Sequence, residues 1–522
     1  MTAVSEVRDA VRELFWKVYG PENITSGSFV ELAEARRLAG IVEDSLKTMA
    51  KIRLFPSDSW VLKSLSITPE PHSVVASPGI VSSSVEGALF KLEGDPSCEE
   101  TWRGFPEGRI AVVREPGNPD DLKLAAINAA RAGALGLMVE SPSAPRVIVV
   151  NAYKGFSYTS GSPIDIPVVV VEEGYYSRTW SERVSIEVEA EVRESRSAIV
   201  EAEVGEGDDL VLVGAHIDRW FMGALDDVLG IAQAIVAAKL LSEKGLRVRL
   251  LLFGSEEYGA PGYASWYWAW GSRFYAEQLA VSGLLETVKL YVNFDTAGFK
   301  PLRVSGAPQY VSKSILTERC CESPETDSFS FASLGTPSLS LHSMWSKEFK
   351  RIYHTPRDSE NAVDFEEASL AVVEAVRIAS DEPDYSSLEK AVVSALSEGP
   401  LEARRVAYVL SALASRVGWD RLFPELAKRF LKPVLYDYGC RKETDIEAEW
   451  FPEVSSYVRI LRELREGEPP IEVWVAGEER LLYRLRGAAG SSITPLKLAE
   501  QTRAHLKRLW LEVEELQREL VR

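Results

Sequence analysis

The chain has 522 residues, a length that allows roughly three or four domains and a large buried core. Its 59 lysines and arginines stand against 78 aspartates and glutamates, and the resulting net charge of −19 argues against nucleic acid or an anionic membrane as a partner. The amino terminus carries charge where a secretory signal needs an apolar core, and no apolar run approaches the roughly 20 residues of a membrane span. We therefore expect a cytoplasmic protein.

The first 72 residues are expected to form the amino-terminal segment of the main domain. Two helical patterns, Val4–Phe15 and Glu31–Met49, precede a strand-like piece at Trp60–Leu65. From residue 73 to 192 the texture changes to short strands separated by glycine, proline and serine turns. This change predicts a separate, mostly β domain that is inserted into the main one.

Within this inserted part we expect strands at Gly108–Val113, Gly133–Val139 and Ile166–Val171, and a helix at Asp121–Ala132. Ser195–Val204 then reads as a strand that returns to the main body, which we place at residues 193–384.

Residues 385–522 are expected to be mostly helical and offer no metal ligands. Near the end, apolar residues recur three and four positions apart and predict a seam for another helix: Ala499, Thr502, Leu506, Leu509, Val513, Leu516 and Leu520. Either a second copy of the chain or the chain itself could fill this seam, and both alternatives stay open. The four cysteines lack the paired spacing of a thiolate zinc site, and we expect them to be reduced: Cys98, Cys320, Cys321 and Cys440.

Five acidic or imidazole side chains of the main body each lie where a predicted strand meets a loop: His216, Asp226, Glu257, Asp295 and His354. Ligands collect at the carboxyl ends of the strands in an open α/β sheet, so residues far apart in sequence can converge there. Only 5 histidines occur in the whole chain, and two of them fall in this set. The pattern predicts a hydrolytic metal site.

The paired glutamates could have two different roles. Glu257 could bind a metal ion while the uncoordinated Glu256 takes a proton from water and passes it to the leaving amine. Asp226 is short and has two oxygens, so it could bridge two ions about 3.5–4 Å apart. We expect Asp218 to orient the imidazole of His216.

Other polar and aromatic residues have plainer interpretations. We expect His342 to be a packed strand-end residue rather than a sixth ligand, and Asp327 to be equally ordinary. Arg219, Arg351 and Arg357 could hold a substrate carboxylate, although solvated surface positions are the stronger expectation for them. The aromatic run from Tyr263 to Trp270 is expected to place one helix face in the core.

The motifs around these residues resemble those of the co-catalytic zinc metallopeptidases, which include bacterial leucine aminopeptidase, plasma glutamate carboxypeptidase, prostate-specific membrane antigen and the transferrin receptor. That family carries His-x-Asp, Gly-Ala-x-Asp-(Asp/Asn)-x-x-Gly, Glu-Glu-x-Gly, Asn-x-Asp and His-Thr in this order. The matching residues here are His216 and Asp218, Gly223 to Gly230, Glu256 to Gly259, Asn293 and Asp295, and His354 and Thr355.

The resemblance implies two Zn²⁺ ions, with Co²⁺ or Mn²⁺ as alternatives. One ion would be held by His216 and Asp295 and the other by Glu257 and His354, while Asp226 would bridge the two. Glu256 would be the general acid and base. Tyr353 resembles the tyrosine that donates a hydrogen bond to the developing oxyanion, although simple core packing is an equal alternative. The resemblance also raises the question whether the Asp226–Asp227 bond is cis.

The fold implied is an α/β zinc-exopeptidase-like domain with a mixed sheet flanked by helices and a helical domain at the carboxyl end. The order of elements in residues 73–192 resembles the protease-associated domain, which carries no catalytic residues and covers the peptidase cleft in relatives. An inert spacer is the alternative. In the branch of prostate-specific membrane antigen and the transferrin receptor, a carboxyl-terminal helical domain mediates dimerisation, so the resemblance suggests a homodimer.

These features together predict a metal-dependent exopeptidase that cleaves peptide substrates through a metal-bridged water. We expect an aminopeptidase first. A glutamate-carboxypeptidase-like enzyme comes second, favoured by the insertion and by the short interval between His216 and Asp226. The third alternative is a non-catalytic receptor or scaffold that has kept the fold.

Overall fold

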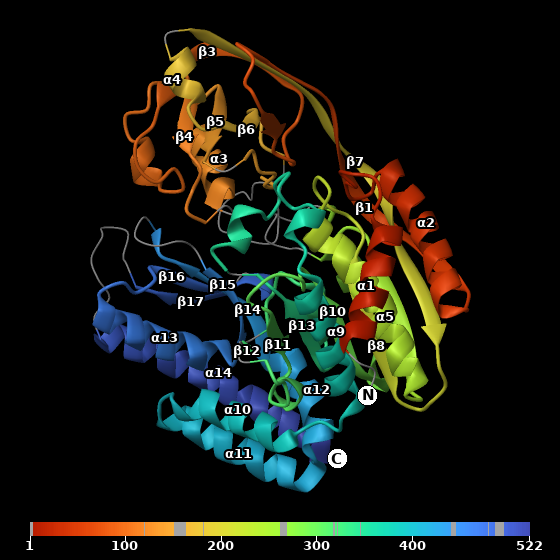
Figure 1. Cartoon of the computed structure of the whole chain (residues 1–522). Helices are drawn as coiled ribbons and strands as arrows, with labels where there is room; N and C mark the ends of the chain where they lie inside the picture. Colours follow the sequence, from red (N-terminus) through yellow and green to blue (C-terminus); the bar gives the residue numbers. More distant parts are fainter. Residues whose placement is uncertain are drawn as a thin grey trace.

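A computed structural model describes residues 4–118, 121–142, 144–150, 163–180, 182–261, 269–316, 319–320, 322–344, 346–439, 445–478, 480–485 and 495–521. Three parts are visible in Figure 1: a central sheet with helices, a smaller unit above it, and a carboxyl-terminal part below.

Four parallel strands form the centre of the main sheet, in the order β13-β10-β8-β9. Their bounds are β8 Leu210–His216, β9 Arg247–Phe253, β10 Val288–Phe294 and β13 Ser338–His342. The antiparallel β7 (Arg183–Val204) lies beside β9, and β11 (Arg303–Gly306), also antiparallel, lies beside β13. The sheet is therefore mixed, as predicted.

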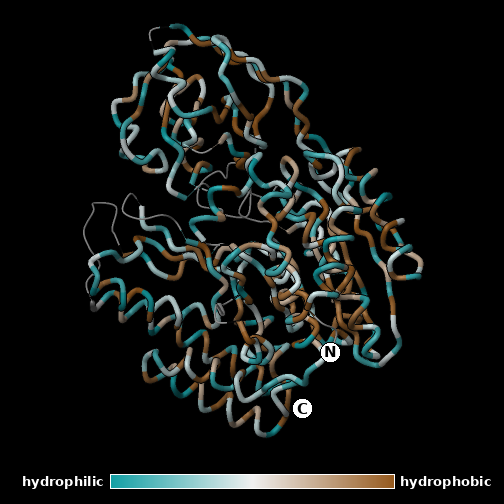
Figure 2. Tube along the Cα trace, viewed as in Figure 1, coloured by the Kyte–Doolittle hydropathy of each residue, from teal (hydrophilic) through white to brown (hydrophobic). Residues whose placement is uncertain are grey.

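Helices cover both faces of this sheet, which explains why its central strands are apolar throughout. On β8, Val211 and Val213 point into one core while Leu210 and Leu212 point into another, because successive side chains of a strand face opposite sides. The first core includes four helices: α1 Val4–Val18, α2 Phe29–Leu46, α5 Leu229–Glu243 and α9 Phe365–Ser380. The second includes α6 Trp270–Val281 and α8 Asp327–Ala332. Figure 2 shows the brown, apolar segments running through the central strands.

A long two-stranded ribbon leads from the sheet to the smaller unit. β1 (Ala50–Thr68) pairs antiparallel with β7 over nearly its whole length. We call the residues between these two strands, 69–182, the insert. Its strands are β2 Val74–Ala76, β3 Ser83–Lys91, β4 Ile110–Arg114, β5 Gly136–Ser141 and β6 Val168–Glu172, and its helices are α3 Leu122–Arg131 and α4 Tyr175–Thr179. The three strands and the helix expected here are thus confirmed within a few residues.

The insert has a hydrophobic core of its own, built from the buried faces of β4, β5, β6 and α3. Three residues of the main body, Trp220, Tyr258 and Ala269, belong to this same core. The insert is therefore packed against the main body and not only tethered to it by the ribbon.

The carboxyl-terminal part contains helices α10 Tyr385–Ser397, α11 Leu401–Val417, α12 Trp419–Phe430, α13 Pro452–Glu466 and α14 Pro495–Val521. It also contains a four-stranded antiparallel sheet, in the order β15-β14-β16-β17, that the sequence analysis missed. Its strands are β14 Leu431–Asp437, β15 Asp445–Trp450, β16 Glu472–Val475 and β17 Arg480–Arg484.

The predicted apolar seam of α14 packs within its own chain. Leu506, Leu509, Val513 and Leu516 are buried in the main core cluster together with residues of α11 and α12. The chain itself fills the seam, so α14 gives no support of its own to a homodimer.

Three further expectations concern cysteines, aromatic residues and membrane spans. Cys98 forms a disulfide, so the expectation that every cysteine is reduced is wrong. Most of the aromatic run, Tyr263 to Trp268, lies outside the described residues. In the described part of the chain, no helix has the length and apolar character needed to cross a membrane.

Candidate metal centre

The carboxyl ends of three neighbouring parallel strands bring the predicted ligands together. His216 is the last residue of β8, and Asp295 directly follows β10. Glu257 lies four positions beyond the end of β9. Because β10, β8 and β9 are adjacent and parallel, their ends share one edge of the sheet. Asp226 lies just before α5, as expected.

Asp226 lies between the two histidines. Its Oδ1 is 3.0 Å from Nε2 of His216, and its Oδ2 is 3.4 Å from Nε2 of His354. The same Nε2 of His354 lies 2.9 Å from Oε1 of Glu257. These four side chains are buried. One carboxylate therefore offers a separate oxygen to each imidazole, which is the arrangement expected of a bridging ligand.

Ligand atoms gather closely enough to hold a metal ion in two overlapping groups. One consists of His216, Asp226 and Glu257, and the other of His216, Asp227 and Asp295. The sequence analysis did not predict Asp227 as a member of such a group. Its oxygens accept from the backbone N–H groups of His216 and Gly230, both at 3.1 Å. The oxygens of Asp227 are thus engaged by the backbone, whereas those of Asp226 face the two imidazoles. The peptide bond between the two is cis.

Asp218 supports the site differently from the prediction. The Nδ1 of His216 lies 2.8 Å from the backbone oxygen of Asp218, so the main chain orients the imidazole. The Asp218 carboxylate instead accepts from the backbone N–H groups of Glu256 and Glu257, both at 3.0 Å, and from the Ser26 hydroxyl at 2.6 Å. It therefore fixes the strand end that carries the paired glutamates.

The loop around His354 has supports that sequence reasoning missed. Asp358 accepts from the backbone N–H groups of Leu225 and Asp226 at 2.8 and 3.2 Å, and so ties this loop to the bridging residue. Its position four residues after His354 was the only available signal. Tyr353 stacks on the His354 ring, with centroids 3.7 Å apart. The role of the Tyr353 hydroxyl stays a prediction.

Two of the residues considered in other roles are buried. His342 is fully buried at the end of β13, where burial and the nearby Arg303 lower its pKa to about 3. The Arg219 guanidinium contacts the backbone oxygens of Ile217 and Pro21 and the Glu34 carboxylate, at 3.0, 3.1 and 3.4 Å. The expectation that Arg219 lies on the solvated surface is therefore wrong.

Buried carboxyl groups outnumber the two imidazoles by a wide margin: Asp218, Asp226, Asp227, Glu256, Glu257, Asp295, Asp327 and Asp358. Asp327, at the start of α8, was not expected among them. Burial and neighbouring acids raise the pKa of Asp295 to about 7, and burial with Asp226 does the same for Asp358.

The acidic surrounding raises the pKa of the two imidazoles as well, which favours their charged form. Burial alone would lower the pKa of His354, but the carboxylates of Glu257 and Asp226 outweigh it and raise that pKa to about 10. Burial alone would raise the pKa of Asp226, but the two imidazoles lower it. Buried negative charge in such excess is costly unless it is paired or coordinates a metal. The donor set fits a divalent cation on this ground.

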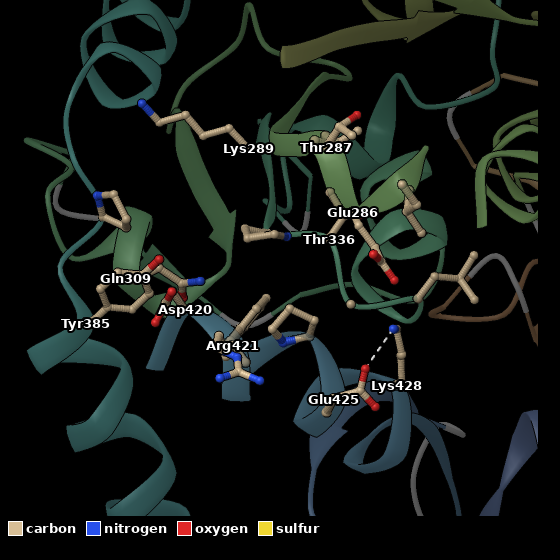
Figure 3. A pocket seen from close by; sticks show the side chains of 18 of the residues that line it. Glu286, Thr287, Lys289, Gln309, Thr336, Tyr385, Asp420, Arg421, Glu425 and Lys428 are labelled. Carbon is tan, nitrogen blue, oxygen red and sulfur yellow. Dashed lines mark hydrogen bonds and ion pairs between the residues drawn. The ribbon is translucent and has the colours of Figure 1, made fainter. Parts of the chain in front are cut away.

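A cavity of about 1090 Å³ lies elsewhere, between the main body and the carboxyl-terminal helices (Figure 3). Glu286, Thr287 and Lys289 line it at the amino end of β10, and Asp420 and Lys428 line it from α12. Ligands of an α/β sheet gather at the carboxyl ends of the strands, so this cavity lies at the opposite edge of the sheet from the predicted metal ligands.

Comparison with known proteins relates part of the chain to a peptidase family. Residues 198–315 match the family model described as Peptidase family M28. The chain is 29% identical over 215 residues to an aminopeptidase of Pseudomonas aeruginosa, covering 38% of this chain and 37% of that protein. It is 26% identical over 256 residues to a probable lipoprotein aminopeptidase, LpqL, of Mycobacterium tuberculosis, covering 47% and 48%. The chain thus spans less than half the length of these relatives.

Among solved structures, the chain is similar to BSAP, a zinc aminopeptidase from Bacillus subtilis, with 18% identity, a TM-score of 0.57, and 73% of this chain and 94% of that chain covered. A peptidase M28 precursor from Shewanella amazonensis gives 18% identity, a TM-score of 0.53, and coverage of 72% and 96%. These likenesses confirm the predicted fold class. The family resemblance is confirmed as well, because the segment that carries His216, Asp226, Glu257 and Asp295 matches peptidase family M28.

Proposed function

We propose that this protein is a dizinc exopeptidase that removes residues from the free amino terminus of peptides. The observation that carries the proposal is the position of Asp226, which presents one oxygen to each of two imidazoles inside a cluster of buried acids. A receptor or scaffold without chemistry would not need this uncompensated charge.

In this proposal His216 and Asp295 hold one ion, Glu257 and His354 hold the other, and Asp226 is shared. The contact of 2.9 Å between His354 and Glu257 supports the second pair. Two Zn²⁺ ions, or Co²⁺ or Mn²⁺ in their place, supply Lewis acidity that lowers the pKa of water and polarises the scissile carbonyl when bound.

Glu256 is the proposed general base and acid. Its backbone is fixed by Asp218, and burial together with neighbouring acids raises the pKa of its carboxyl group. A raised pKa suits a group that must accept a proton from water and release it to the leaving nitrogen near neutral pH. The Tyr353 hydroxyl is the proposed donor to the developing oxyanion.

The acidity of the centre favours a free amino terminus over a free carboxylate as the recognised group. An ammonium group gains from nearby carboxylates, whereas a substrate carboxylate would be repelled and needs an arginine partner. Arg219, one candidate partner, is engaged by Glu34 and backbone oxygens instead. The names of the curated relatives and of BSAP point the same way.

The test compares two substrates at equal concentration with Zn²⁺ or Co²⁺ supplied. We expect hydrolysis of Leu-p-nitroanilide and no hydrolysis of an N-blocked dipeptide with a free carboxylate. Cleavage of only the blocked dipeptide would establish the carboxypeptidase alternative. If neither is cut while the purified protein binds the metal, the exopeptidase proposal fails, and absence of metal binding would leave the scaffold alternative.

A further inference from the structure

We infer that the insert holds one half of the dinuclear centre, namely the Glu257 and His354 half, and that Arg146 is the positioning residue that locks it there. The inference rests on the proposed metal centre. According to this inference, the insert supports one of the two metal positions, and the main body alone supports the other.

The first observation is a pair of backbone contacts between the insert and His354. The N–H of Val147 donates to the backbone oxygen of His354 at 3.0 Å, and Nδ1 of the imidazole lies 3.1 Å from the oxygen of Val147. With Nε2 turned towards Glu257 and Asp226, Nδ1–H is the donor to Val147. This bond fixes both the tautomer and the ring orientation of the ligand.

The second observation is the neighbouring guanidinium. Arg146 is buried and donates to the Glu115 carboxylate at 2.6 Å, to the backbone oxygen of Lys350 at 2.6 Å, and to the backbone oxygen of Tyr353. Glu115, which follows β4, also accepts from the hydroxyl of Ser141 at the end of β5. A single side chain therefore joins two strand ends of the insert to the loop that precedes His354.

This task needs an arginine. The planar guanidinium presents several N–H groups in a rigid fork and can serve three acceptors that point from different directions. A lysine ammonium could keep the charge opposite Glu115, but it is a compact point charge without the planar fork of the guanidinium and would not hold both loop carbonyls in place.

The third observation concerns Glu257. Its Oε2 accepts from Nε1 of Trp220 at 3.2 Å. Trp220 lies in the hydrophobic core of the insert, and its ring meets the His354 ring edge-on at 6.5 Å. The insert thus supports His354 directly, and it supports Glu257 indirectly, through a tryptophan of the main body that packs in the core of the insert.

The other metal position has different supports. His216 is oriented by the backbone oxygen of Asp218 and by Asp227, both in the main body. The N–H of Asp295 donates to the backbone oxygen of Leu341 in β13 at 3.1 Å. Within the described part of the chain, no hydrogen bond or ion pair joins a group of the insert to either residue. Loosening the insert should therefore weaken one metal position and spare the other.

The test measures Zn²⁺ and Co²⁺ binding to the metal-depleted full-length protein by calorimetric titration, together with the visible absorption spectrum of bound Co²⁺. Loss of a partner outside the ligand set typically lowers metal affinity by about 10–100-fold. We expect wild-type protein to bind two ions, and Arg146→Gln to bind one with unchanged affinity and the second about 10–100-fold more weakly. Arg146→Lys should fall between the two.

Arg459→Gln is the matched control. Arg459, in α13, is also largely buried and engages three acids, Asp445, Glu447 and Glu463, far along the chain from the centre. Its loss should destabilise the protein without changing either metal affinity. Should Arg146→Gln not fold, Trp220→Phe is the second variant, because it keeps an aromatic ring in the core of the insert while it removes the N–H donor to Glu257 together with the second ring of the indole.

Three results are distinguishable. Selective weakening of one ion in Arg146→Gln or Trp220→Phe supports the inference. Two wild-type affinities in either folded variant, or equal weakening of both ions, overturns it. Absence of metal binding by the wild-type protein would overturn the metal centre itself, and the inference with it.

Discussion

Replacing Asp218 by asparagine tests how the strand end that carries the paired glutamates is held. The Asp218 carboxylate accepts two backbone N–H groups and one hydroxyl. An asparagine of the same shape has only one accepting oxygen, and its NH₂ group faces a donor. One of the two backbone N–H groups therefore loses its acceptor inside the buried site.

The size of the effect follows from these contacts. A hydrogen bond to a charged group contributes about 1.5–3 kcal/mol, and a buried donor left without a partner costs about 1–3 kcal/mol. The two contributions partly describe the same loss and are not simply added, so we expect the free energy of unfolding to fall by about 2–4 kcal/mol. Freed from Asp218, Glu256 would also shift, and a displacement near 1 Å can lower the turnover rate about 100-fold.

The assay combines urea unfolding of the metal-depleted protein with kcat on Leu-p-nitroanilide after zinc is restored. Ser26→Ala is the graded control, because it removes only the hydroxyl bond and leaves both backbone bonds to Asp218 intact. It should cost about 1 kcal/mol and leave kcat nearly unchanged. Wild-type stability and kcat in Asp218→Asn would refute the role assigned to this carboxylate.

Three further outcomes are expected. Glu256→Gln should lower kcat by about 10²–10⁴-fold while the metal content stays the same, because the change removes the proton carrier but no ligand. A kcat within roughly threefold of the wild-type value would exclude Glu256 as the general base. In Gly230→Ala the new Cβ would lie 2.1 Å from Oδ1 of Asp227, so we expect a loss of about 1–3 kcal/mol and weaker metal binding, and an unchanged thermal midpoint would contradict this packing. Finally, the folded-state pKa values of Asp295 and His354 are raised to about 7 and about 10, so each group favours the folded state below its unfolded pKa and loses this contribution as pH rises through the folded value. The contribution of Asp295 is lost between its usual pKa of 3.8 and about 7, and that of His354 between 6.5 and about 10. The thermal midpoint of the metal-depleted protein should therefore fall as the pH rises through these two windows, and a midpoint that rises would contradict the sign.

The positions of His216 and Asp295 at strand ends could be predicted because they depend on local patterns. An apolar run that ends in His216, or in Asn293 and Asp295, marks both a buried strand and its exit, and the parallel order of the strands brings those exits together. The match of residues 198–315 to peptidase family M28 and the likeness to BSAP confirm the predicted resemblance and fold class.

Contacts between distant segments could not be predicted. Arg146 and Val147 lie about 200 positions before His354, and no pattern in either segment indicates the other. The role of the Asp218 carboxylate depends on where the β9 strand end passes, which is a property of packing. The carboxyl-terminal sheet was missed for a related reason. β15 contains glutamates and an alanine that favour helix, and only pairing with β14 makes it a strand.

The most direct test of the central claim is the number of zinc ions bound by the purified chain and by Asp226→Asn, measured by titration and elemental analysis. If Asp226 bridges a dinuclear centre, wild-type protein takes up two ions, and the variant loses tight binding of both together with peptidase activity. Two tightly bound ions in Asp226→Asn, or none in the wild-type protein, would contradict the account.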